Sequence, residues 1–157
     1  MKNRILITGA LGQLGQFFVK SLISKNNYVL ATDIKENKIL NCDFEIFDIM
    51  DEERGDYLLK KYNINQIYNF AAILSAKGEQ NPLLTWEINN AGFINIANLC
   101  LKNNIKKIFW PSSIAVFGRN SNLDLVNNDE PMLPETIYGV SKLACEKAMF
   151  YFNYKNL

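Results

Sequence analysis

The chain opens with Ile5-Leu6-Ile7-Thr8-Gly9-Ala10-Leu11-Gly12-Gln13-Leu14-Gly15. An apolar run stops at regularly spaced glycines and helical periodicity follows, which predicts a strand, a tight turn and a helix start. The glycines permit the turn, the approach of a pyrophosphate to the backbone, and close packing of the helix on its strand. The N-terminus of such a helix favours an anion. The stretch therefore predicts a phosphate-binding turn formed by Gly9, Leu11, Gly12, Gln13, Leu14 and Gly15.

The length and composition fit one domain, which we expect to span residues 1–157. With 17 basic and 16 acidic residues the net charge is +1, so no surface for nucleic acid or anionic membrane is expected. No uninterrupted run of about 18 apolar residues occurs, and the N-terminus predicts a strand instead of a basic and apolar leader. We therefore expect a cytoplasmic protein whose partner is a small molecule.

The residue types restrict the chemistry that the chain could perform. Cys42, Cys100 and Cys145 are widely spaced and the chain has no histidine, so neither a disulfide framework nor a metal site is expected. The same absence excludes Ser-His-Asp and Cys-His nucleophiles and histidine proton shuttles. Any acid or base must therefore be a tyrosine, lysine, aspartate or glutamate.

A second predicted strand, 28–32, ends at Asp33, about 20 residues beyond the glycines. A carboxylate at this place accepts hydrogen bonds from the ribose diol of an adenine dinucleotide and repels a 2′-phosphate, so NAD is favoured over NADP. An aspartate at a strand end is also common in ordinary turns. The glycine turn upstream favours the ribose interpretation.

The remaining pattern alternates strands with helices. Strands are predicted over 45–49, 66–72 and 108–113, and helices over 14–23, 51–61, 83–103 and 138–154, with a long polar loop over 118–135. This order predicts a doubly wound parallel α/β sheet of the Rossmann type, in which ligands bind at the carboxyl ends of the strands. Candidate residues follow those ends: Asp48 and Ile49 for the adenine pocket, Ala71 and Ala72 for a flat ligand, and Ser75, Ser112 and Ser113 as hydroxyls.

Tyr138 and Lys142 lie one helical turn apart and share a helix face. A lysine ammonium favours the phenolate form of a nearby tyrosine, which can then take a proton from an alcohol. Tyr57 with Lys61 and Tyr151 with Lys155 have the same spacing. Only Tyr138 opens a helix after the strand that ends at Ser113, so we assign the other two tyrosines to packing or surface.

The glycine turn, Asp33, Ala71-Ala72, Asn89, Ser113 and Tyr138-Gly139-Val140-Ser141-Lys142 together resemble the extended short-chain dehydrogenase/reductase family, the NAD-dependent epimerase/dehydratase family. The resemblance covers the whole chain. Three stretches resemble the short-chain type of L-threonine 3-dehydrogenase within it: Leu74-Ser75-Ala76, Asn81-Pro82 and Phe109-Trp110-Pro111-Ser112-Ser113-Ile114-Ala115-Val116-Phe117-Gly118.

The resemblance implies oxidation of L-threonine to 2-amino-3-oxobutanoate with NAD as cofactor. Tyr138 would be the general base, Lys142 would support it and hold the nicotinamide ribose, and Ser113 would hydrogen-bond the reacting hydroxyl. Ser75 and Ser112 would orient the amino acid. Asn89 matches a family asparagine near the cofactor, although an ordinary asparagine on a helix face is the alternative.

Two residues depart from the family pattern: Asn69 stands where many relatives have histidine, and Phe93 where epimerases often have threonine. The resemblance also implies that the chain is the N-terminal half of such an enzyme, ending before the C-terminal substrate lobe. We expect NAD binding to survive and turnover to be severely impaired. The alternatives are a sugar-nucleotide epimerase or dehydratase and a nucleotide-binding module without activity. The 83–103 and 138–154 helices would form a homodimer.

Overall fold

The computed structural model describes residues 3–36, 41–105, 107–119, 121, 126–127 and 129–155, and within these ranges five strands form one parallel sheet. The strands are β1 (Arg4–Thr8), β2 (Tyr28–Asp33), β3 (Asp43–Ile46), β4 (Gln66–Asn69) and β5 (Ile108–Phe109). Their order is β3-β2-β1-β4-β5, and every neighbouring pair is parallel. This confirms the predicted Rossmann-type architecture.

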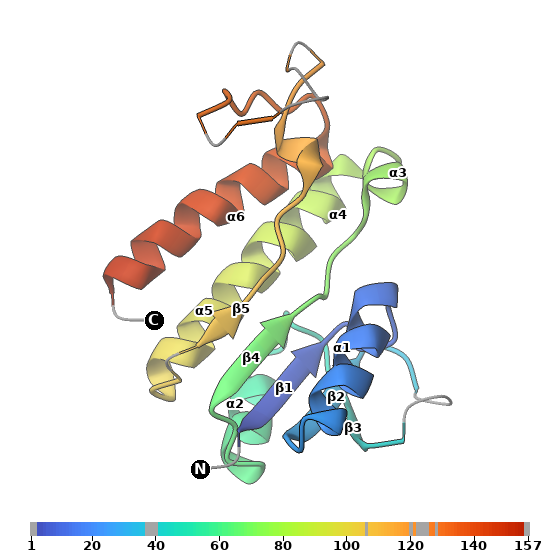
Figure 1. Cartoon of the computed structure of the whole chain (residues 1–157), viewed down its shortest axis with the longest axis vertical. Coiled ribbons are helices and arrows are strands. Elements are labelled where there is room, and N and C mark those ends of the chain that lie inside the picture. The colour runs from blue at the N-terminus through green and yellow to red at the C-terminus, as the bar shows by residue number, and fades with distance from the viewer. Residues whose placement is uncertain are drawn as a thin grey trace.

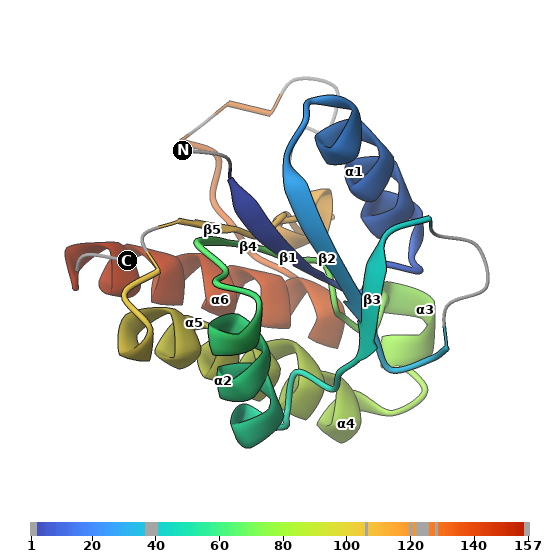
Figure 2. The same cartoon turned by 90° about the horizontal axis from the view of Figure 1, so that it is seen from below.

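Helices lie on both faces of the sheet (Figures 1 and 2). On one face lies α1 (Gln13–Ser24), and on the other lie α2 (Glu52–Lys61), α5 (Gly92–Lys102) and α6 (Ile137–Tyr154). The short α3 (Ser75–Gly78), α4 (Pro82–Trp86) and the 3₁₀ turn η2 (Ile114–Val116) follow the carboxyl ends of the central strands. No helix in the described ranges is both long enough and apolar enough to cross a membrane.

The apolar run of β1 packs into both layers of the core. Ile5 and Ile7 face α1, where Val19 packs on them, whereas Leu6 faces the opposite layer with Leu58 of α2. Adjacent residues of a strand point to opposite faces, and a parallel strand covered on both faces is apolar throughout. This explains why the first strand reads as a continuous hydrophobic run.

The predicted 83–103 helix is present but is not a regular α-helix along its whole length. Between α4 and α5 the chain forms one π-helical segment, η1 (Glu87–Ala91). Phe93, Ile96, Ala97 and Cys100 are buried in this segment, whereas Leu84 and Leu101 are exposed. The exposed leucines leave part of the helix surface available to the predicted homodimer.

Three predicted strands are longer than the observed ones. Strand β3 spans Asp43–Ile46, and the chain then turns as the Asp48 carboxylate accepts a hydrogen bond from Met50 N at 2.9 Å. Strand β4 ends at Asn69 because its neighbour β1 ends at Thr8. Strand β5 pairs with β4 at only two positions. Strand length depends on pairing partners that are distant in sequence, which a local pattern does not contain.

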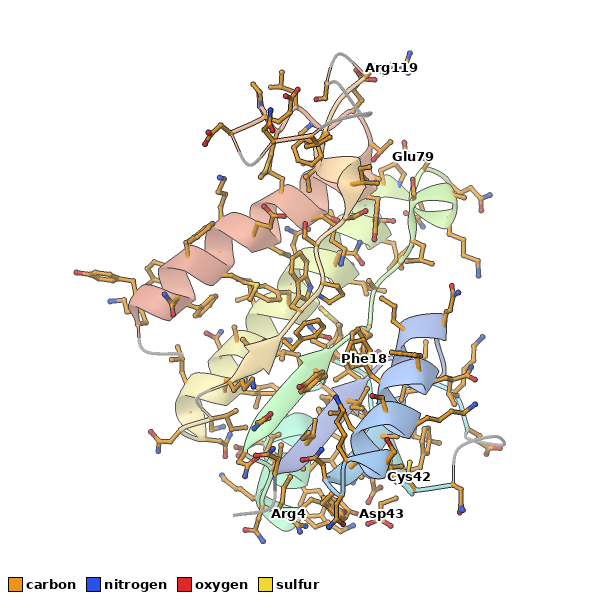
Figure 3. All side chains as sticks on the ribbon, in the orientation of Figure 1. Arg4, Phe18, Cys42, Asp43, Glu79 and Arg119 are labelled. Atoms are coloured by element: carbon orange, nitrogen blue, oxygen red, sulfur yellow. The ribbon has the colours of Figure 1, made fainter. Side chains whose placement is uncertain are left out.

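An aromatic cluster lies on the α1 face of the sheet and reaches the outer strand. Phe18 of α1 packs on Tyr68 and Phe70, and Phe109 of β5 joins them with ring centroids 5.2–5.9 Å away. Figure 3 shows Phe18 between α1 and the sheet. Phe109 is 38% exposed, and β5 is the last strand of the sheet in the described ranges. Within the described ranges, the β5 edge of the sheet is therefore open, beside a partly covered aromatic face.

Candidate functional site

The glycine turn after β1 leaves no room for a side chain at its first position. Gly9 has φ +61°, and a Cβ there would lie 2.7 Å from Ala71 N, on the segment that follows β4. A Cβ on Gly15 would lie 2.3 Å from Gly9 O, so the first turn of α1 packs directly on the loop. These two glycines allow two backbone segments to lie against β1, as predicted.

Gly12 is different because it has φ −70° and ψ 169°, which any residue adopts. A Cβ there would meet one protein atom within 4 Å, Gly9 O at 3.2 Å. Gly12 precedes α1, which has neither a side-chain cap nor an acidic residue in its first turn. Because protein packing scarcely requires Gly12, its missing side chain leaves open backbone at a helix N-terminus, a site that suits a phosphate.

Asp33 lies at the end of β2 and contacts this turn. Its Oδ2 accepts a hydrogen bond from Leu11 N at 3.1 Å, and its Oδ1 accepts one from Lys35 N at 3.3 Å. The carboxylate therefore holds the glycine loop against the second strand. This contact gives Asp33 a structural role in addition to the predicted interaction with ribose.

A cleft of about 230 Å³ brings half of the predicted cofactor residues together. From the predicted set it is lined by Gly9, Gly12, Asp33, Asp48, Ile49, Ala71 and Ala72. It is also lined by residues that the sequence did not single out, namely Ile34, Phe47, Phe70, Ile73 and Ile88. Most of these residues are sequence neighbours of a predicted residue at a strand end, and this position is a signal that could have identified them. The other predicted cofactor residues do not line the cleft, namely Leu11, Gln13, Leu14, Gly15, Asn89, Tyr138 and Lys142.

Asn89 lies in η1 and is buried, and its side chain joins two segments of the site. Its Oδ1 accepts a hydrogen bond from Ile73 N at 2.8 Å, and its Nδ2 donates to Ile73 O at 3.0 Å and to Ser141 Oγ at 3.2 Å. Ser141 Oγ donates in turn to Tyr138 O at 2.7 Å. Asn89 thus links the loop after β4 to the helix that bears Tyr138, and contact with a cofactor remains a prediction.

Ser113 and Tyr138 are on elements that touch each other. Ser113 caps η2 by accepting a hydrogen bond from Ala115 N at 3.2 Å. A Cβ on Gly139 would lie 2.1 Å from Ala115 O, so α6 starts against η2 and only glycine fits there. The structure therefore places the segment that carries Ser113 next to the first turn of α6, which carries Tyr138. Their catalytic roles remain predictions.

The start of α6 is fixed by two residues that the sequence analysis missed. Thr136 caps the helix by accepting a hydrogen bond from Gly139 N at 3.0 Å, and Glu79 accepts one from Ile137 N at 2.9 Å. Figure 3 shows Glu79 beside the region where α6 begins. A threonine before a helix is a recognisable cap, whereas the contact with Glu79 depends on tertiary structure. Together they fix the helix turn that carries Tyr138.

Lys142 is buried at 5% exposure, and its Nζ donates to Pro111 O at 2.8 Å. Its Nζ lies 5.7 Å from the centre of the Tyr138 ring, so the predicted pair is adjacent. Burial lowers the pKa of Lys142 from 10.5 to about 8, with a smaller opposite effect from Cys145. At neutral pH the side chain is therefore still mainly an ammonium.

The predicted substrate serines lie in two different cavities. Ser75, the first residue of α3, lines a cavity of about 230 Å³ with Ala115 and Thr136, next to the start of α6. Ser112 lines a cavity of about 440 Å³ with Trp110 and Met149, on the α6 side of β5. The structure therefore does not bring Ser112 together with Ser75.

The comparisons with known proteins agree with this geometry. The profile of the NAD-dependent epimerase/dehydratase family matches residues 5–156. An uncharacterised epimerase/dehydratase of Staphylococcus aureus strain USA300 is 37% identical over 159 residues, which cover 96% of this chain and 48% of the relative. The chain therefore spans about half the length of the curated relatives it matches.

Two solved structures illustrate the range of similar folds. A monomeric L-threonine 3-dehydrogenase from a metagenome, in its apo form, is 38% identical with a TM-score of 0.91, covering 97% of this chain and 50% of that one. A UDP-glucose 4-epimerase of Thermotoga maritima, solved with UDP-glucose, is 25% identical with a TM-score of 0.89. The match covers 98% of this chain and 52% of that one.

Replacing Lys142 by methionine tests the buried ammonium. The pKa of Lys142 is lower in the folded chain than in the unfolded one, so its charge destabilises the fold below about pH 8. The free energy of unfolding of the wild type, relative to K142M, should therefore rise by roughly 3 kcal/mol as the pH rises from about 8 to 10.5. Urea denaturation of both proteins across this range measures the difference.

The control is K147M, which removes an exposed lysine from the same helix. Its stability relative to wild type should not change over this pH range. If the difference in the free energy of unfolding between wild type and K142M instead stays constant over this pH range, the Lys142 ammonium is solvated in the folded chain and the prediction is wrong.

Proposed function

The chain belongs to the NAD-dependent epimerase/dehydratase family, and on this premise we propose that it carries the cofactor site and the Ser113-Tyr138-Lys142 group of an NAD-dependent L-threonine 3-dehydrogenase. The proposed reaction is the oxidation of L-threonine to 2-amino-3-oxobutanoate. The proposed cofactor site rests on one observation, the cleft that is lined by both the glycine turn and Asp33. Similarity to a solved L-threonine 3-dehydrogenase supports L-threonine as the substrate.

The residues of the cleft fit a dinucleotide. The open N-terminus of α1 at Gly12 would hold the pyrophosphate through backbone N–H groups. Asp33 would accept hydrogen bonds from the adenosine ribose, and its charge disfavours a 2′-phosphate. Asp48 and the apolar Ile49 would border the adenine. When bound, the nicotinamide ring supplies the acceptor for the two electrons that leave the alcohol.

The proton chemistry would fall to Tyr138. As a phenolate it would accept the proton of the threonine hydroxyl, which Ser113 would orient by a hydrogen bond. The ammonium of Lys142, close to the Tyr138 ring, favours this phenolate electrostatically and would donate to the nicotinamide ribose. Ser75, which lines the cavity next to the start of α6, would contact the amino acid. The separate position of Ser112 weakens its proposed role in orienting the substrate.

A sugar-nucleotide epimerase or dehydratase is the second candidate, and its support is the similarity to the UDP-glucose 4-epimerase. Phe93 is fully buried where such enzymes often have threonine, and the identity to the threonine dehydrogenase is higher, 38% against 25%. A third candidate is a nucleotide-binding module without turnover.

Calorimetric titration with NAD followed by L-threonine, together with a steady-state assay of NAD reduction, tests this function. We expect NAD to bind this chain alone and threonine turnover to be at least 100-fold below that of a full-length relative, because positioning the substrate contributes several kcal/mol to catalysis. Absence of NAD binding would reject the proposed cofactor site. Turnover of UDP-glucose in place of threonine would favour the epimerase, and NAD binding without any turnover would favour the module.

Replacing Asp33 by asparagine tests the proposed ribose contact. The amide oxygen can still accept the hydrogen bond from Leu11 N, but the charge is lost. We expect NAD affinity to fall about tenfold, as for a lost charged hydrogen bond, and the preference for NAD over NADP to narrow. The control E36Q removes a nearby exposed carboxylate that does not line the cleft. Equal NAD and NADP affinities already in the wild type would contradict the assignment.

A homodimer through α4, α5 and α6 is also proposed. Leu83, Trp86, Phe150 and Tyr154 are exposed apolar side chains on these helices, a pattern typical of an interface. The similar L-threonine 3-dehydrogenase is described as monomeric, which is the alternative. Light scattering at micromolar concentration should give twice the mass of the chain. L83E on α4 should halve this mass, whereas K20E, at an exposed position of α1 on the opposite face of the sheet, should not. A wild-type monomer would exclude this dimer.

A further inference from the structure

Trp110 lies directly after β5, between two side chains of different kinds. On one side Phe93 of α5 packs against it, with ring centroids 5.5 Å apart. On the other side Lys142 Nζ lies 4.1 Å from the centre of the Trp110 ring, well within cation–π distance. Phe93 is 1% exposed, and its ring plane is inclined at 58° to the indole, so a buried core residue supports Trp110. The three side chains contact one another in series, from Phe93 of α5 through Trp110 to Lys142 of α6, and we call this series the stack.

The ammonium in this stack has an unusual environment. It is buried, and within the described residues none of the ion pairs involves it. Its hydrogen bond goes to the Pro111 carbonyl, on the residue that follows Trp110. A buried charge without a counterion costs free energy unless dipoles or π systems compensate it. The two closest contacts that do so come from the segment 110–111, and the Tyr138 ring on α6 adds a longer one at 5.7 Å.

We propose that Trp110 is a positioning residue for Lys142, whose indole face holds the buried ammonium beside the Pro111 carbonyl. The aromatic ring stabilises the charge electrostatically and fixes the direction of a long, flexible side chain. An ammonium has three N–H donors, so donors remain for a ligand. That this ligand is the nicotinamide ribose rests on the proposed function, whereas the coupling of Trp110 to Lys142 does not.

The stack also explains a residue that departs from the epimerase pattern. A threonine at position 93 would leave the space behind the indole partly empty, whereas Phe93 fills it. The titratable groups that face Lys142 are Tyr138 and Cys145, both on α6, and the packed residues on the other elements, Trp110, Pro111 and Phe93, carry no charge. Among the residues contributed by elements other than α6, Trp110 is therefore the one whose aromatic ring interacts with the charge on Lys142.

The test is an NMR titration of the Lys142 side chain in the cofactor-free chain labelled with ¹³C-lysine, the signal being assigned by its absence in K142M. The wild-type midpoint is expected near pH 8. In W110L the loss of the ring should destabilise the ammonium and lower the midpoint by roughly half a pH unit to one pH unit. W110F keeps an aromatic face and should restore much of the wild-type value.

The direction in which the Lys142 midpoint moves in W110L distinguishes a positioning role of Trp110 from simple packing. If Trp110 only excludes water, W110L lets water reach the ammonium and the midpoint rises toward 10.5. A rise or an unchanged midpoint in W110L would overturn the proposal. The control is F152L, which shortens a buried aromatic residue of the same cluster, and its midpoint should equal that of the wild type.

A second measurement keeps the proposal testable if W110L does not fold. The chain has two tryptophans, and Trp86 is on α4, so in W86F the emission reports Trp110 alone. Emission should change with a midpoint near pH 8, and this step should disappear in W86F/K142M. A step that persists without Lys142 would overturn the coupling. Because neither titration contains NAD, failure of NAD binding would reject the proposed function and leave this result unaffected.

Discussion

The close contact between Gly9 and the backbone of Phe70 and Ala71 is the constraint on which the site depends. It joins the end of β1 to the segment after β4, and the same loop is held to β2 by the Asp33 carboxylate. Three central strands thus meet at one loop whose first residue lacks a side chain. The cleft above them exists because the backbone at Gly9 and Gly12 occupies so little volume.

A second set of contacts organises the other half of the site around α6. Asn89 and Ser141 join the loop after β4 to the carbonyl of Tyr138, while Glu79 and Thr136 fix the first turn of the helix. The π-helical segment at Asn89 belongs to this arrangement, since Cys145 Sγ contacts its carbonyl at 3.4 Å. Such segments occur often at functional sites, where they alter the register of a helix. The two halves of the site are therefore connected through buried polar side chains.

The sequence predicted the architecture, the glycine turn and the place of Asp33 well because each rests on local spacing. Strand ends were predicted less well, since the end of β4 depends on where β1 stops. The roles of Asn89 and Glu79 as links between segments arise from tertiary contacts and have no local signal. The separation of Ser112 from Ser75 likewise depends on tertiary structure, since the two serines line different cavities.

The open edge at β5 has a consequence for the behaviour of the chain in concentrated solution. An unpaired edge strand is a template for strands of other molecules and hence a route to aggregation. Here the edge offers only two paired residues, and Pro111, which has no N–H to donate, follows soon after. Exposed Lys107 precedes the strand and adds a charge that repels another copy. Because β5 is short, its exposed edge offers little backbone for fibre-like association.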